Sequence, residues 1–147
     1  MTTKDLLALS ERLLCQLEFN YGITEDEQGL LIPTEDDRVI LVLTDECDFD
    51  DRKWPVLVFV VVLLTDVDSR PGDASPLVKA NADCMFGSVV LNDDKELLLH
   101  HFCVGWPGGA EFQVTFELMA ASAEGVLEML GNRISGSAAK PFSEVVS

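Results

Sequence analysis

The side chains best suited to chemistry in this chain are two adjacent histidines and the cysteines around them. His100 and His101 are followed by Cys103, and Cys84 lies upstream. If this stretch is a strand, the two histidines point to opposite faces and do not bind one metal together. Zinc normally needs three or four ligands at a matching spacing. His101 and Cys103 would share a face about 7 Å apart, which is too far for direct proton transfer.

The acidic runs offer oxygen ligands, so a calcium loop is the next motif to test. The segment "DFDDRK" begins at Asp48 and places Arg52 where the calcium loop needs a ligand, and "DVDSRP" from Asp66 fails at the same position. No glycine-rich phosphate loop, dinucleotide fingerprint or nucleophile elbow appears. We therefore expect no catalytic residue, no metal site and no cofactor, and hence a protein that is not an enzyme.

Composition narrows the classes of partner. Lys and Arg total 10 against 26 Asp and Glu, a formal net charge of -16. That balance argues against nucleic acid and against anionic membranes, both of which attract basic surfaces. The first residues, "MTTKDLLALSERLL", interrupt their apolar side chains with charges, unlike a secretory signal. We expect a cytoplasmic protein with reduced cysteines.

Positioning any site requires a scaffold, and its strongest element is "VLVFVVVLL", residues Val56–Leu64. The run is shorter than the roughly 20 residues of a transmembrane helix and is rich in β-branched valine, so it predicts a strand. Alternation sends Val56, Val58, Val60, Val62 and Leu64 to one face, and Leu57, Phe59, Val61 and Leu63 to the other. A strand that is apolar on both faces is expected at the centre of a sheet whose two faces are both covered.

The N-terminal half supplies a helix and a hairpin. Residues 2–20 show leucines at helical spacing, with Thr2 or Thr3 as the cap and Gly22 as the stop. Two strands follow, around residues 30–32 and 38–44, and "DECDFDDRK" reads as an acidic loop before the central strand.

The C-terminal half supplies a short helix, a second hairpin and a long helix. The short helix starts at Ser75 and runs toward Cys84 or Met85, and the hairpin strands are about 87–91 and 96–104, joined by "NDDK". Residues 112–116 alternate as in a strand, yet they also begin a helical stripe that continues to Leu130. We favour a helix over about 110–130, capped by Gly131.

Together these elements predict an α+β fold of order α-β-β-β-α-β-β-α. Strands joined by short turns imply a mostly antiparallel, twisted sheet flanked by helices. We expect residues 1–134 to form a single domain and residues 135–147 to be a mobile tail.

Two stretches, "PLVKANADCMFGSVVLNDDKELLLHHF" and the leucine-rich helix leading into "YGI", carry a resemblance. With the order of elements over about residues 3–131, the chain resembles the type III secretion chaperone-like fold. That fold includes the class I secretion chaperones and the YbjN-like proteins. The resemblance implies a homodimer, with the short second helix and the neighbouring strands near the two-fold interface. The residues expected there are Leu77, Val78, Asn81, Met85 and Val89.

The resemblance also implies a protein client, held as an extended segment. We expect this client on the leucine stripe of the first helix: Leu6, Leu9, Leu13 and Leu17. The same leucines could instead form core, and the sequence leaves this open. A small regulatory or ligand-binding domain of the YbjN kind is the alternative function.

Overall fold

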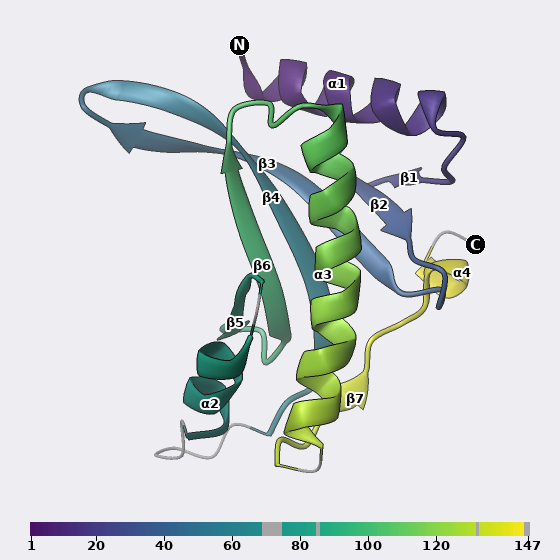
Figure 1. Cartoon of the computed structure of the whole chain (residues 1–147), viewed down its shortest axis with the longest axis vertical. Helices are drawn as coiled ribbons and strands as arrows, with labels where there is room; N and C mark the ends of the chain where they lie inside the picture. The colour runs from purple at the N-terminus through teal and green to yellow at the C-terminus, as the bar shows by residue number, and fades with distance from the viewer. Residues whose placement is uncertain (69–74, 85, 132, 146–147) are drawn as a thin grey trace.

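The structure of the chain is a computed structural model that describes residues 1–68, 75–84, 86–131 and 133–145. It confirms the predicted α+β fold (Figure 1). All strand pairings are antiparallel, in the order β1-β2-β3-β4-β6-β5, with β7 pairing β4. The strands are β1 (Gly22–Ile23), β2 (Gly29–Pro33), β3 (Val39–Phe49), β4 (Arg52–Thr65), β5 (Ser88–Leu91), β6 (Leu97–Val104) and β7 (Ser137–Ala138). The helices are α1 (Thr3–Gln16), α2 (Ser75–Asp83), α3 (Gly109–Leu130) and α4 (Phe142–Val145).

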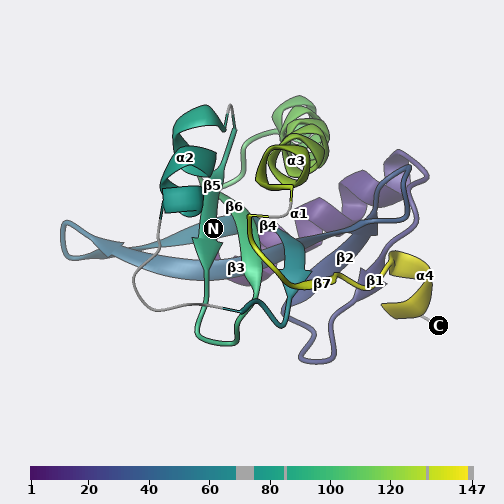
Figure 2. The same cartoon turned by 90° about the horizontal axis from the view of Figure 1, so that it is seen from below.

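The core lies between the sheet and its helices. Helices α1, α2 and α3 lie on one side of the sheet, which we call the helical face (Figure 2). Strand β4 is central, and its predicted alternation is confirmed as far as Leu63. Leu64 was predicted to share a face with Val56, but a register shift between Val62 and Leu64 lets it pack against the core on the helical face. Leu57, Phe59, Val61 and Leu63 join the core beneath the helices. Phe59 meets Phe112 of α3 edge-on, with ring centroids 5.1 Å apart.

The opposite side of the sheet, which we call the open face, carries the other half of the β4 pattern. Val56, Val58 and Val60 form a second apolar cluster. The apolar side chains packed against these valines, among the described residues, come from the sheet itself: Leu41, Leu43 and Leu98. The expectation that the short helix helps to cover this face is wrong, because α2 lies with α1 and α3 on the helical face. Cover by a second subunit or a client stays a prediction.

Helix α1 begins as predicted and ends earlier than predicted. Thr2 and Asp5 form a capping box: the Asp5 N–H donates to the Thr2 hydroxyl at 3.2 Å, and the Thr2 N–H donates to the Asp5 carboxylate at 2.7 Å. The helix ends at Gln16, not near Gly22. Glu18 takes φ 58°. Its N–H donates to the carbonyl of Cys15 at 3.2 Å and the N–H of Phe19 donates to the carbonyl of Leu14 at 3.0 Å, which is a Schellman closure. Glycine is usual at this position, so the glutamate gave no sequence signal for the end of the helix.

The ambiguous segment at residues 112–116 is helical, as favoured. It belongs to α3, whose buried side chains recur at helical spacing: Phe112, Thr115, Met119, Ala123, Val126 and Leu130. Gly131 closes the helix at φ 51°, and its N–H donates to the carbonyl of Leu127 at 3.1 Å. In the described part of the chain, no helix is both long and apolar enough to span a bilayer.

The C-terminal segment lies along one end of the open face. Strand β7 pairs with Leu64 and Thr65 of β4. The N–H of Phe142 donates to the carbonyl of Asp37 at 2.8 Å, which holds α4 beside β2. The mobility expected for residues 135–147 stays a prediction, but its described part has this defined position.

Candidate interaction surface

The leucines predicted to receive a client differ in accessibility. Leu6 is fully buried in the core, so its side chain cannot meet a client in this conformation. Leu13 is half-buried and packs against the core, while Leu9 and Leu17 are also half-exposed. The stripe is thus partly core and partly surface, and only its outer members remain candidates for binding.

The residues predicted at a dimer interface are mostly engaged within the monomer. Val89 is buried. The side-chain amide of Asn81 accepts from the Val89 N–H at 2.7 Å and donates to the Val89 carbonyl at 2.9 Å, which fastens α2 to β5. Leu77 packs against the core. Val78 is 65% exposed, and Met85 lies outside the described residues.

The histidines point to opposite faces, as predicted. His101 lies against Phe86 on the helical face, with ring centroids 4.4 Å apart, and His100 lies against Phe102 at 4.8 Å. Burial lowers the pKa of both imidazoles, and His100 lowers that of His101 further. Burial, with the nearby Glu111 carboxylate, raises the pKa of the Cys103 thiol, which disfavours the nucleophilic thiolate. Within the described ranges, no group of three or more metal-ligating side chains occurs.

The open face carries the second apolar cluster of the described residues. Strand register places Leu41 and Leu43 of β3, then the β4 valines, then His100, Phe102 and Val104 of β6 side by side. The three valines are only 6–9% exposed because larger neighbours flank them. Those neighbours form the outer surface, where Phe102 is 55% and Val104 64% exposed. Contiguous apolar surface of this kind marks a binding site more often than a bare monomer surface.

A two-stranded arm extends this face beyond the sheet (Figure 1). Strand β3 pairs with β2 up to Leu43, and β4 pairs with β6 from Val56 onward. Beyond these points, residues 45–49 and 52–55 pair with each other. The turn residues Asp50 and Asp51 both have positive φ, 55° and 57°, as in the two-residue hairpin turn that matches strand twist.

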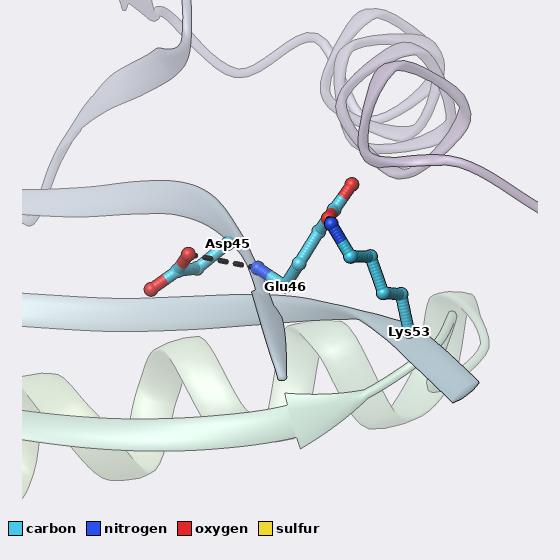
Figure 3. Close-up of polar contacts among 3 residues, drawn as sticks. All are labelled: Asp45, Glu46 and Lys53. Carbon is cyan, nitrogen blue, oxygen red and sulfur yellow. Dashed lines mark hydrogen bonds and ion pairs between the residues drawn. The ribbon is translucent and has the colours of Figure 1, made fainter. Parts of the chain in front are cut away.

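The two sides of this arm have different chemistry. On the helical side, Glu46 and Lys53 form an exposed ion pair at 3.9 Å (Figure 3). The Asp45 carboxylate accepts from the Glu46 N–H at 2.8 Å. On the open-face side, the Arg52 guanidinium lies 4.6 Å from the Trp54 ring centroid. Phe49 is 72% exposed.

Sequence reasoning missed this arm and read "DECDFDDRK" as a loop. Aspartate and glutamate are depleted in strands, and this weighed against the correct reading. Two signals were available. Cys47, Phe49 and Trp54 keep the period-2 register of the flanking strands, and the pair Asp50-Asp51 suits a tight hairpin turn.

A cavity lies beside α3, separate from the open face. It has a volume of about 610 Å³, and its lining includes five carboxylates, two phenylalanines and one base, Arg38. The Phe19 and Phe116 rings are 6.1 Å apart. A hydrogen bond with Asp36, and the charge of that carboxylate, raise the pKa of Glu124. The acids and aromatic rings together would suit a cation better than an anion.

The antiparallel sheet with helices on one face defines the fold as YbjN-like α+β. The solved structure of YbjN from E. coli, described as a candidate transcription regulator, matches with a TM-score of 0.60. The match covers 89% of this chain and 96% of that chain at 14% sequence identity. No family model matches the sequence, and no curated protein matches it. At this identity the likeness establishes the fold.

Proposed function

We propose that the chain is a non-enzymatic protein-binding domain, a homodimeric adaptor that holds an extended segment of a protein client as the class I secretion chaperones do. One observation carries the protein-association part of this proposal. The open face is apolar, and the apolar side chains packed on its central valines come from the sheet itself. A surface of this type gains free energy when a protein covers it, at roughly 25 cal/mol per Å² of apolar area. Exposed apolar patches often mark sites of protein association.

The client would bind along the outer leucines of α1. Leu9 and Leu17 are half-exposed on that helix. Burial of each leucine by a client would contribute at most roughly 1.5–3 kcal/mol. The acidic connector Glu25–Glu27 lies close by in sequence and is exposed. Its charges would mainly change the rate of association and its salt dependence.

Co-purification of the tagged chain from its native host tests this function. We expect a protein that the wild type retains and the double variant Leu9→Ser/Leu17→Ser loses. Val114→Ser is the matched control, because Val114 is exposed on α3. Circular dichroism must show that all variants are folded. If the leucine variant retains the client, while neutralising Glu25, Asp26 and Glu27 abolishes retention even at high salt, the acidic surface is the recognition site.

The alternative is a small regulatory or ligand-binding domain. Two observations favour it: the concavity beside α3, and the description of YbjN as a candidate regulator. Thermal shift with cationic and anionic small molecules tests this alternative. Stabilisation by a cation that Phe116→Ser abolishes would favour it over the adaptor, and no stabilisation by any compound would count against it.

A further inference from the structure

We infer that the open face and the projecting arm form the contact with a second copy of this chain, each arm lying across the other copy's sheet. This inference rests on the proposed dimeric function, and it assigns the surface involved. It moves the dimer contact from α2, where the resemblance placed it, to β3, β4 and β6.

The open-face side of the arm carries Cys47, Phe49 and Trp54 between Asp45 and Arg52, although the arm has no core in which to bury them. Residues 45–49 and 52–55 project past the sheet, yet Cys47, Phe49 and Trp54 alternate in register with the open face. The opposite side bears the Glu46–Lys53 ion pair. A two-stranded ribbon alone is at best marginally stable in water. An amphipathic ribbon with an exposed phenylalanine at its tip is therefore suited to contact another surface.

Charge selects a second copy as the occupant of that surface. The chain carries -16, so most pairings of its surfaces bring like charges together. The open face is different, because the side chains that its strands present between Asp45 and the end near Glu96 are uncharged. One end of the face holds Asp45 with Arg52, and the other holds Glu96 near Lys140. A two-fold axis across the strands brings unlike ends together, so acids can face bases.

The dimensions also fit. Five or six residues of extended arm reach about 20 Å, and the valine stripe from Val56 to Val62 is about as long, at roughly 3.4 Å per residue. A stable interface involves about 20–30 residues on each side. The arm and the part of the open face away from the C-terminal segment supply most of such a set: Leu43, Asp45, Cys47, Phe49, Arg52, Trp54, Val56, Val58, Val60, Ser88, Val90, Leu98, His100, Phe102 and Val104.

Shortening the arm tests the inference while leaving the domain intact. Asp45 and Val56 are cross-strand partners, so Asn-Gly can replace residues 46–55 as a two-residue turn. Sedimentation equilibrium from micromolar to hundreds of micromolar should show a wild-type dimer of twice 16.1 kDa and a monomeric shortened variant. Circular dichroism should show that the shortened variant keeps its fold.

Point variants give a second, independent test of the dimer contact. Phe102→Ser should raise the dimer dissociation constant at least about 30-fold, since aromatic anchors at interfaces often exceed 2 kcal/mol at 1.4 kcal/mol per tenfold. The control Lys53→Gln, on the other side of the arm, should leave it within about twofold. A dimer that resists arm shortening and Phe102→Ser but dissociates with Val78→Ser overturns this inference and keeps the proposed dimeric function. A wild type that stays monomeric throughout overturns both the inference and the dimer.

Discussion

Asn81 either fastens α2 to β5 within one chain or contacts a second chain. The variant Asn81→Ala separates these two roles by measurement. The resemblance placed this residue at a dimer contact. The structure gives its amide two hydrogen bonds to the main chain of Val89, at 2.7 and 2.9 Å. Alanine removes both partners and leaves the N–H and carbonyl of a buried residue unpaired. The loss should therefore appear in the stability of each single chain.

The magnitude follows from the two bonds. A net 0.5–1.5 kcal/mol for each gives a loss of about 1–3 kcal/mol in the free energy of unfolding. For a chain of this size, each kcal/mol lowers the melting temperature by roughly 2–4 °C, so we expect a decrease of about 4–8 °C for 2 kcal/mol. Val78→Ser, on the same helix but 65% exposed, should change stability by less than about 0.5 kcal/mol.

Urea denaturation at several protein concentrations is the suitable assay. If Asn81 stabilises the single chain, Asn81→Ala should lower the free energy of unfolding by the same amount at every protein concentration, including those at which the wild type is monomeric. If Asn81→Ala leaves the monomer as stable as wild type and weakens only the dimer, then the Val89 bonds contribute nothing and the interface reading was correct. Hydrogen exchange at the Val89 amide would show directly whether the bond is lost.

Three further predictions concern the core, a helix end and pH. Phe59→Ala should cost about 3–5 kcal/mol in urea denaturation because Phe59 is fully buried, whereas Leu118→Ser on the outer side of α3 should cost little. Glu18→Gly should raise the melting temperature, since glycine takes φ 58° without strain, and a decrease would contradict the Schellman assignment. Burial, and secondly the charge of His100, lower the folded pKa of His101, so the unfolded chain binds protons first as the pH falls. Stability should fall as the pH drops through 6.5 to that lowered pKa, and His101→Gln should flatten this part of a melting-temperature curve.

Regular periodicity made much of the scaffold predictable. The nine apolar residues from Val56 to Leu64 predicted a central strand, and their alternation assigned the side chains up to Leu63 to the correct faces. It failed at Leu64, because strict alternation cannot anticipate the register shift after Val62. The same pattern could not show what covers each face, because coverage depends on where helices distant in sequence pack. The helical stripe from Phe112 to Leu130 likewise outweighed the brief alternation at its start, since buried positions continue at helical spacing for the whole of α3.

Prediction failed where residue type and backbone conformation disagreed. Glu18 holds a left-handed position that glycine usually takes, so α1 was drawn too long. Asp50 and Asp51 also take positive φ, inside a run of acids that read as a loop. Two of the predicted site residues have structural roles for another reason. Leu6 is core, and Asn81 binds its own chain, because one leucine stripe or one helix face serves folding and binding with the same residue types.

An acidic chain with an apolar sheet face must avoid indiscriminate association, and the arm shows how the two features coexist. Charged side chains at Asp45, Glu46, Asp48 and Lys53 occupy the arm. Charges on exposed strands oppose edge-to-edge pairing with other chains. Net negative charge also keeps unrelated surfaces apart in solution. The middle of the open face carries no charge that would repel another acidic protein, so this surface can pack against the face of another sheet. Charge placement and apolar placement therefore favour the same kind of contact, one that needs a partner with a matching uncharged surface.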